Sequence, residues 1–141
     1  GYAVDTMETA VDWSKLSQAV ENIESAIRNG LADEGEQVHT YTHLSHVYGQ
    51  GSSIYTTYLF RLGDSYGQAM ERWHKLKAAG ANQIVASGGT ISHQHGVGRD
   101  HRDYLVAEKG DLGLAAINSL CQLFDPDSQM NPGKLLPDEL N

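Results

Sequence analysis

The chain has 141 residues, enough for one domain around one hydrophobic core, and its apolar content of 40% is ordinary for a globular protein. Its formal net charge of −8 argues against a nucleic-acid-binding protein, which needs a basic face. No apolar run is long enough to cross a bilayer, and the first residues do not have the pattern of a signal peptide.

The first clear periodicity predicts a helix that ends near Gly30. Its apolar residues recur at the spacing of one buried stripe: Leu16, Val20, Ile23 and Ile27. Asp12 or Ser14 can cap the start of this helix, and Gly30 is a natural stop. The polar, acidic segment 31–36 is expected to be a connecting loop.

From Val38 onward the pattern changes to the alternation of a β-strand. One side of the segment 38–48 would carry His39, Tyr41, His43, Ser45 and Val47. The turn Gly49-Gln50-Gly51 separates this segment from the β-rich run 52–62, so the two runs predict a hairpin. Because a two-stranded hairpin is only marginally stable alone, we expect residues 2–11 to add a third strand.

A long helix is predicted from Asp64 or Ser65 to Gly88-Gly89, although Gly80 could split it. A short strand at 90–92 is expected next. These elements predict an α+β fold, in which an antiparallel sheet packs with helices and a C-terminal helical tail follows.

The tail begins with a last helix, predicted at 108–124, and ends in an irregular segment rich in Pro and Gly. One apolar stripe of this helix is expected to be buried: Leu112, Ala116, Leu120 and Phe124. Cys121 is expected to be a small core residue of the same helix. As the only cysteine it excludes an internal disulfide and fits a reducing compartment, so we expect a cytoplasmic protein.

The most unusual segment is the loop 88–101, which contains three of the seven histidines and four of the fifteen glycines. Glycines let a ligand approach the main chain, and histidines act as acids, bases or metal ligands near neutral pH. One interpretation is a metal-binding module that uses His93, His95 and His101, although the spacing supplies no fourth ligand. Another is a site in which imidazoles exchange protons with an organic ligand. A polar surface loop is the third, and the glycine spacing favours a site over it.

Four stretches share an order that is informative when they are taken together. They are Ser45-His46-Val47-Tyr48, Ile54-Tyr55, the run Gly88-Gly89-Thr90-Ile91-Ser92-His93-Gln94-His95-Gly96-Val97-Gly98, and Asp125-Pro126 leading to Asn131-Pro132-Gly133-Lys134-Leu135-Leu136. This order resembles the C-terminal active-site region of the FAD-linked oxidase family, and within it the alkyldihydroxyacetonephosphate synthases. The resemblance spans residues 45–136, about two-thirds of the chain.

The resemblance implies a flavoenzyme with two domains. An N-terminal domain would hold the FAD, and residues 1–100 would be part of the substrate or cap domain, of the ferredoxin-like type, with the histidine-rich loop. Residues 101–141 would form a helical tail that returns toward the missing FAD domain. The chain starts at Gly1 and has no Gly-rich dinucleotide segment before residue 88. We therefore expect a fragment that does not bind FAD by itself and is inactive alone.

The resemblance also implies roles for individual residues. Tyr55 falls on the tyrosine that the synthases use as an acid/base, and His93 and His95 match the outer members of their triple histidine. The middle member is Gln94 here, and an amide can hydrogen-bond but cannot exchange a proton at neutral pH. Substrate-binding residues would be Gln94 and Ser92. Residues near the cofactor would be Gly96, Gly98, Asn131 and Lys134.

The implied reaction exchanges the acyl group of acyl-dihydroxyacetone phosphate for an alkyl group through an adduct at flavin N5, in ether-lipid synthesis. The alternative is an FAD-dependent dehydrogenase of a 2-hydroxyacid or alcohol. A metal-binding module and a non-catalytic α+β interaction domain stay open as other classes. The expected partners are a small-molecule or lipid-like substrate and the missing FAD domain, with no nucleic acid; a homodimer stays open.

Overall fold

A three-stranded antiparallel sheet with the order β1-β3-β2 organises the chain in this computed structural model, which describes residues 1–137 and 140. Strand β1 spans Tyr2–Asp12, β2 spans His39–His43 and β3 spans Gly51–Arg61. The helices are α1 (Leu16–Arg28), α2 (Tyr66–Ala86) and α3 (Leu105–Phe124), and 3₁₀ turns lie at Trp13–Lys15, Ala32–Glu34 and Arg102–Tyr104. The α+β class, the third strand near the N-terminus and the first helix are confirmed.

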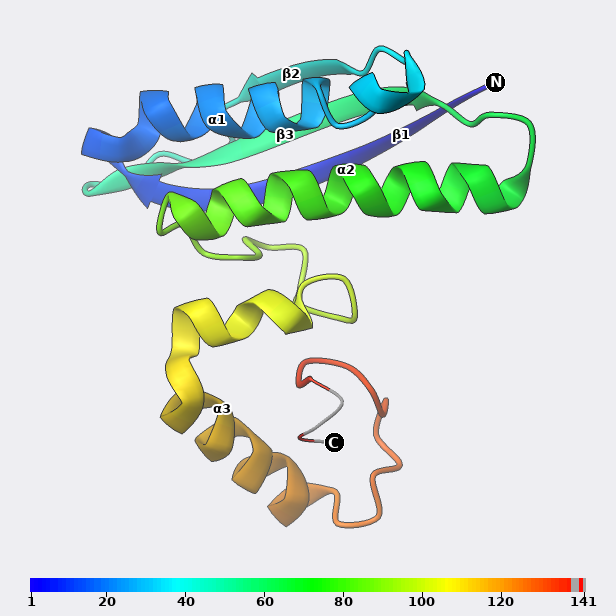
Figure 1. Cartoon of the computed structure of the whole chain (residues 1–141). Coiled ribbons are helices and arrows are strands. Elements are labelled where there is room, and N and C mark those ends of the chain that lie inside the picture. The colour runs from blue at the N-terminus through cyan, green and yellow to red at the C-terminus, as the bar shows by residue number, and fades with distance from the viewer. Residues whose placement is uncertain (138–139, 141) are drawn as a thin grey trace.

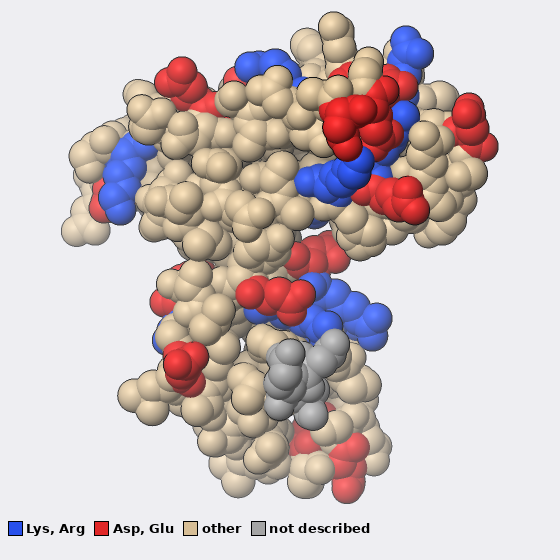
Figure 2. All heavy atoms as spheres, in the orientation of Figure 1, with Lys and Arg blue, Asp and Glu red and all other residues tan. Residues whose placement is uncertain are grey.

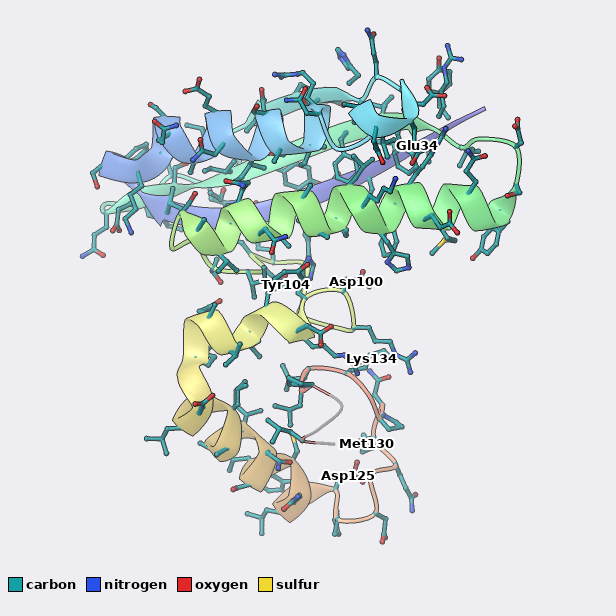
Figure 3. All side chains as sticks on the ribbon, viewed as in Figure 1. Glu34, Asp100, Tyr104, Asp125, Met130 and Lys134 are labelled. Carbon is teal, nitrogen blue, oxygen red and sulfur yellow. The ribbon has the colours of Figure 1, made fainter. Side chains whose placement is uncertain are left out.

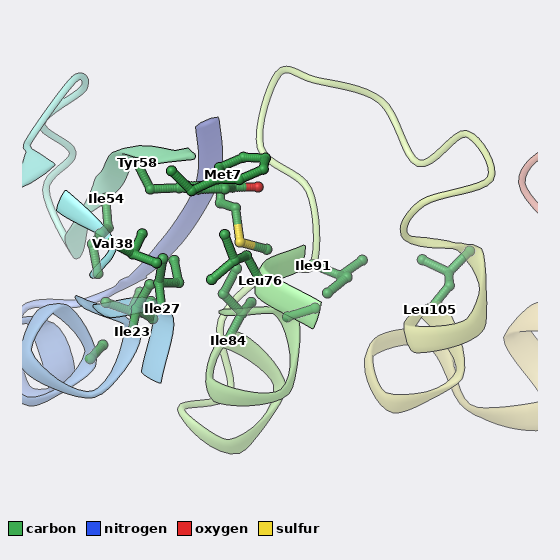
Figure 4. Close-up of a cluster of buried hydrophobic side chains, with 14 of the residues drawn as sticks. Met7, Ile23, Ile27, Val38, Ile54, Tyr58, Leu76, Ile84, Ile91 and Leu105 are labelled. Carbon is green, nitrogen blue, oxygen red and sulfur yellow. The ribbon is translucent and has the colours of Figure 1, made fainter. Parts of the chain in front are cut away.

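The hydrophobic core lies between the sheet and the helices α1 and α2 (Figure 4). Figure 1 shows these two helices side by side along the sheet, with α3 and the C-terminal tail set apart from them. Side chains that are almost fully buried come from every layer: Met7, Ile23, Ile27, Ile54, Tyr58, Leu76 and Ile84. Burying one such side chain contributes about 1.5–3 kcal/mol, so this cluster holds the helices to the sheet.

The strand register decides which side chains face the helices. Asp5 lies opposite Tyr58, and its carboxylate accepts hydrogen bonds from Tyr58 and from Trp73 of α2. Because successive side chains of a strand point to opposite faces, Glu8 and its partner Tyr55 lie on the other face. His43 of β2 is the neighbour of Tyr55 on that face. The predicted alternation is thus correct over 39–43.

The strand predicted for 38–48 is shorter than expected. β2 ends at His43, and the rest is a loop that keeps one isolated bridge between Val47 and Ser52. Serine hydroxyls take over here: Ser52 Oγ donates to the backbone oxygen of His46 (2.7 Å), and Ser53 Oγ accepts from its amide (2.7 Å). Such side-chain bonds compete with a regular ladder.

The short strand predicted at 90–92 is absent from the described structure, although this segment runs along the free edge of β1. Thr90 N donates to the oxygen of Ala10 (3.3 Å), and His93 N donates to the oxygen of Glu8 (3.1 Å). The two donors, Thr90 and His93, are three residues apart in the loop, whereas the two acceptors, Ala10 and Glu8, are two residues apart in β1. The extra residue breaks the ladder, as in a β-bulge.

Helix α2 is continuous through Gly80, so the predicted long helix is confirmed and the possible split is not present. Ser65 caps it, because its hydroxyl accepts from the amide of Gln68 (3.1 Å). Gly80 is buried where α2 crosses β1. A β-carbon added there would lie 2.3 Å from Met7 Sδ and 3.1 Å from Ile27 Cδ1.

The prediction for the last helix is wrong in its start and in its buried face. α3 begins at Leu105, and Gly110 interrupts it with φ 64° and ψ 170°, which turns the face of the following residues. All four residues of the predicted stripe are exposed: Leu112, Ala116, Leu120 and Phe124. Leu114 is buried instead, and Cys121 is exposed. No helix within the described residues is long and apolar enough to span a membrane.

Opposite charges neutralise one another where α2 passes the 3₁₀ turn Ala32–Glu34, and Figure 2 shows red and blue side chains together on this face. Arg72 Nε lies 2.7 Å from Glu34, and Lys75 Nζ lies 2.8 Å from Glu34 and 3.0 Å from Asp33. The Arg72 side chain is buried, and its Nη1 donates a hydrogen bond to the backbone oxygen of Arg61 (2.9 Å). These contacts fasten α2 to the 3₁₀ turn Ala32–Glu34 and to the last residue of β3.

Asp5 accepts hydrogen bonds that connect the sheet to α2. Tyr58 Oη (2.8 Å) and Trp73 Nε1 (2.6 Å) donate to Asp5 Oδ2, and Lys77 Nζ lies 2.8 Å from the same oxygen. Burial raises the pKa of Asp5, but the hydrogen bond and charge of Lys77, aided by the Thr6 amide and Trp73, outweigh it, so the pKa lies below its ordinary value.

Asp5→Asn should lower the free energy of unfolding at neutral pH by about 1–3 kcal/mol, because the donors lose a charged acceptor. The folded-state pKa of Asp5 is depressed, so its stabilisation is complete above the unfolded-state value of about 3.9 and is lost as the pH falls further. Urea unfolding at pH 7 and at lower pH measures this difference. Asp12→Asn at the exposed end of β1 is the control. Equal unfolding free energies of wild type and Asp5→Asn at pH 7 would contradict the assignment.

Gly80→Ala should destabilise the protein by about 1–3 kcal/mol despite the better helix propensity of alanine, because the added methyl overlaps buried Met7. Gly67→Ala in the same helix is the matched control, since only Ser65 Oγ lies near its added β-carbon, at 3.8 Å. The control should gain about 0.4–1 kcal/mol. Thermal unfolding compares the two, and a stabilised Gly80→Ala would refute the close packing.

Candidate active site

The carboxylate of Glu8 is the centre of the candidate site. Its side chain is 1% exposed and lies on the sheet face away from α1 and α2. Ser45 Oγ donates to Glu8 Oε1, and Ser45 in turn contacts the hydroxyl of Ser53. Every ion-pair partner of Glu8 in the described part of the chain is a histidine. A buried carboxylate needs a compensating charge or hydrogen bonds, and here imidazoles are in position to supply them.

Three imidazoles face this carboxylate. Nδ1 of His93 lies 3.3 Å and Nδ1 of His46 lies 3.9 Å from Glu8 Oε1, while Nε2 of His95 lies 3.5 Å from Oε2. His93 Nδ1 is fully buried and has no well-aligned hydrogen bond, so its approach to Glu8 is an ion-pair distance rather than a formed bond. Catalytic hydrogen bonds are often long in the absence of substrate.

The side chains of His93 and His95 each also contact a tyrosine. His93 Nε2 lies 2.9 Å from the hydroxyl of Tyr48, and the ring of His95 meets Tyr55 edge-on with centroids 5.5 Å apart. On its other side Tyr55 stacks on His43 at 5.0 Å. The structure therefore brings the predicted residues Tyr55, His93 and His95 together.

The position of Gln94 differs from that of its neighbours. It has φ 63°, a left-handed conformation that is uncommon outside glycine, and its side-chain Nε2 lies 3.3 Å from Nε2 of His46. Gly96 and Gly98 also have positive φ, and an added β-carbon at either would meet no atom within 4 Å. Ser92 Oγ donates to the oxygen of Gly96 (2.7 Å), so its hydroxyl shapes the loop.

Asn131 and Lys134 lie elsewhere. Both line a hollow of about 190 Å³ between α3 and the tail, together with Asp125 and Met130 (Figure 3). The tail does return to the histidine loop, because Leu135 N donates to the oxygen of Gly98 (3.1 Å). No contact of Asn131 or Lys134 with the histidine cluster occurs among the described residues.

The metal-ligand set suggested by spacing is not assembled. His101 is 7% exposed, and its Nδ1 lies 3.3 Å from the oxygen of Gly96. Burial and the nearby charge of Lys77 lower the pKa of this imidazole. Within the described residues, the set with ligand atoms inside 4.8 Å of one another is Glu8, His46 and His93, a spacing that could hold a metal ion.

Glu8, His46 and Tyr48 lie in the candidate site although the sequence pattern assigns them no role there. The segment 45–48 belongs to the resemblance, which gives none of its residues a function. The sequence gives one weak indication that Glu8 has a special role. It is the only charged residue in segment 6–11 of a predicted strand. Only the register with β3, which sets Glu8 opposite Tyr55, distinguishes it from a solvent-facing carboxylate.

Such a cluster of imidazoles and tyrosines around a buried carboxylate is typical of enzymes that move protons. The chain matches the family model for the C-terminal domain of FAD linked oxidases over residues 1–135. The chain therefore belongs to this family, and membership implies FAD as the cofactor.

Individual relatives agree with the family. The chain is 25% identical over 128 residues to alkyldihydroxyacetonephosphate synthase of Caenorhabditis elegans. This alignment covers 89% of the chain and 21% of that protein. It is 36% identical over 66 residues to glycolate oxidase subunit GlcD of Bacillus subtilis, 47% of the chain and 14% of that protein. A solved alkyldihydroxyacetonephosphate synthase has the same fold, with a TM-score of 0.59 at 21% identity over 93% of the chain and 20% of the synthase. The chain thus spans about a fifth of the synthase length.

Glu108 of α3 fastens the start of the histidine loop. Its Oε2 accepts from Thr90 Oγ1 (3.0 Å) and from the amide of Ile91 (3.0 Å). Burial raises the pKa of Glu108, but the hydrogen bonds of Lys109, Ile91 and Thr90 outweigh it, so the pKa lies below its ordinary value.

Glu108→Ala should free the loop at its N-terminal end and speed hydrogen exchange of the Ile91 amide about 5–30-fold, the equivalent of losing about 1–2 kcal/mol of local stability. Exchange followed by NMR measures this, with Glu21→Ala on α1 as the control. Unchanged Ile91 protection in Glu108→Ala would show that the bonds to β1 hold the loop without α3.

Proposed function

We propose that this chain is the substrate-domain part of an FAD-dependent enzyme that acts like alkyldihydroxyacetonephosphate synthase and exchanges the acyl group of acyl-dihydroxyacetone phosphate for an alkyl group. The observation that carries the proposal is the convergence of Tyr55, His93 and His95 on buried Glu8. These residues come from β1, β3 and the loop after α2, so only the folded domain assembles them.

The proposal divides the chain as the resemblance does. Residues 1–100 would belong to the cap domain, and residues 101–141 would return toward an FAD-binding domain outside this chain. The hydrogen bond from Leu135 N to the oxygen of Gly98 supports a tail that passes beside the loop. The exposed apolar residues of α3, such as Leu120 and Phe124, are consistent with a chain that is not complete by itself.

The residues present fit a flat ligand above the loop. Gly96 and Gly98 leave the space beside their α-carbons empty, and at their positive φ any residue with a side chain would be strained. When bound, the flavin would supply the electron-accepting and adduct-forming chemistry. We also propose that Asn131 and Lys134 lie near the flavin. Because both line the hollow between α3 and the tail, the flavin would have to contact the tail on the side of that hollow.

This chain's own residues would hold the substrate and handle its proton. The Tyr55 hydroxyl, next to His95, would exchange a proton with the substrate oxygen, and Glu8 would stabilise the protonated imidazole of His95 or His93. Gln94 and Ser92 would orient the substrate through hydrogen bonds. A lipid-like substrate, ether-lipid synthesis and a cytoplasmic location are part of this proposal.

An FAD-dependent dehydrogenase of 2-hydroxyacids is the second candidate. The similarity to the glycolate oxidase subunit favours it, and so does Gln94 at the centre of the loop. Both reactions need removal of a hydroxyl proton beside the flavin, so Tyr55, His93 and His95 do not separate them.

In the full-length protein, Tyr55→Phe should lower kcat by about 10²–10⁴-fold, because the phenol that exchanges the proton is lost. Tyr41→Phe, on the same sheet face but outside the histidine cluster, should keep the activity. Product formation from acyl-dihydroxyacetone phosphate and a long-chain alcohol is measured, alongside flavin bleaching by 2-hydroxyacids. Bleaching by a hydroxyacid with no alkyl product would establish the dehydrogenase. Undiminished turnover of Tyr55→Phe would remove Tyr55 from the mechanism.

A further inference from the structure

Glu8, His93 and Tyr48 form a continuous line from the protein interior to its surface. The Glu8 side chain is 1% exposed, the His93 side chain 16% and Tyr48 45%. The phenol oxygen lies 2.9 Å from His93 Nε2, and His93 Nδ1 lies 3.3 Å from Glu8 Oε1. A hydroxyl, an imidazole and a carboxylate in this sequence are the arrangement by which enzymes activate a hydroxyl.

Tyr48 is held in place by contacts that leave its hydroxyl for His93. Its amide donates to the oxygen of Gly51 (2.8 Å), and its own oxygen accepts from Trp13 Nε1 (3.2 Å). Its ring stacks on His46, with an angle of 10° between the planes. The backbone and ring are thus fixed on both sides while the phenol edge stays open to solvent.

The other tyrosines near the sheet lack this combination. Tyr58 is buried and its hydroxyl donates to Asp5, so it cannot contact a ligand. Burial and the charge of Asp5 also raise the pKa of Tyr58. Tyr41 is 51% exposed, and its ring contacts that of His39, with the ring centroids 6.1 Å apart. Exposure together with a hydrogen-bonded imidazole and a carboxylate behind it distinguishes Tyr48.

We propose that Tyr48 is a second acid/base of this active site, with His93 as its proton acceptor and Glu8 as the positioning residue behind His93. The inference rests on the proposed function only in assuming that a hydroxyl-bearing substrate binds at the cluster. It adds a phenol–imidazole pair to the pair formed by Tyr55 and His95, and both pairs share one carboxylate.

The proton balance is closed within these groups. The hydroxyl proton of a bound alcohol moves to Tyr48 Oη as the phenolic proton moves to His93 Nε2. The product is an alkoxide and an imidazolium whose charge is stabilised by Glu8, and the reverse transfer returns the proton to a leaving oxygen. No electrons move in this step. For neutral His93 it requires the tautomer with the proton on Nδ1, facing Glu8, and a free lone pair on Nε2.

The first test uses the 141-residue chain and does not depend on flavin chemistry. Nitrogen-15 NMR of its histidines should show His93 in the Nδ1–H tautomer above its titration range. Tyr48→Phe should displace the His93 Nε2 resonance, and the matched variant Tyr41→Phe should not. A His93 found in the Nε2–H tautomer, or one that is unaffected by Tyr48→Phe, would overturn the proposal. A stoichiometric metal ion on His93 Nδ1 would overturn it as well, because the metal would replace the required proton.

The second test uses the full-length flavoprotein with an alcohol substrate that it turns over. Tyr48→Phe should lower kcat by about 10²–10⁴-fold with KM little changed, while Tyr41→Phe retains wild-type kcat. Glu8→Gln keeps the shape of the side chain and should lower kcat, with Glu8→Asp recovering part of the loss. Full activity of a folded Tyr48→Phe would overturn the role of Tyr48. If the NMR result holds and no tested alcohol reacts even in the wild type, the proposed function fails, while the His93 tautomer and its hydrogen bond with Tyr48 stand.

Discussion

The burial of the Glu8 carboxylate is the constraint on which the candidate site depends. An ionised carboxylate removed from water is strongly unfavourable unless hydrogen bonds or opposite charges compensate for it. Within the described residues no lysine or arginine reaches Glu8; Ser45 and the imidazoles of His46, His93 and His95 do. The histidine loop therefore folds over β1 both to satisfy this carboxylate and to present its own second nitrogens outward. The requirement for charge compensation and the assembly of a reactive centre are the same interaction.

One strand serves two purposes because side chains alternate along it. Asp5 on the helix-facing side of β1 accepts from Trp73 and Tyr58 and joins the layers of the fold. Glu8, three residues later, points to the opposite face and holds the site. The two carboxylates differ in their partners. Asp5 has a lysine as its ion-pair partner, whereas within the described residues the ion-pair partners of Glu8 are imidazoles. A shift of one residue in the β1–β3 register would exchange these environments.

The periodic elements could be predicted from the sequence, and the pairings could not. The stripe Ile23–Ile27, the alternation of 39–43 and the long helix around Gly80 follow from local patterns that the core then confirms. The prediction of the buried face of α3 is wrong because Gly110, with φ 64°, changes the direction of the chain. The spacing of apolar residues does not indicate such a change. For the candidate site, motif resemblance predicts Tyr55, His93 and His95, and the structure brings these three residues together. Glu8 was missed because its significance depends on lying opposite Tyr55, a contact between residues 47 positions apart that only strand register creates.

The glutamine at the centre of the loop acquires a different meaning in three dimensions. Along the sequence, Gln94 stands between His93 and His95, at the position where the resemblance implies a third histidine. In the folded chain, the β2–β3 connection brings His46 to within 3.3 Å of the Gln94 amide and 3.9 Å of Glu8. Three imidazoles therefore still surround the carboxylate. Because His46 is 43% exposed at its side chain and Gln94 can accept or donate a hydrogen bond, the pair keeps an imidazole at the open side of the cluster. The chemistry of this loop is therefore decided by which side chains reach Glu8, and the order of residues within the loop alone does not determine it.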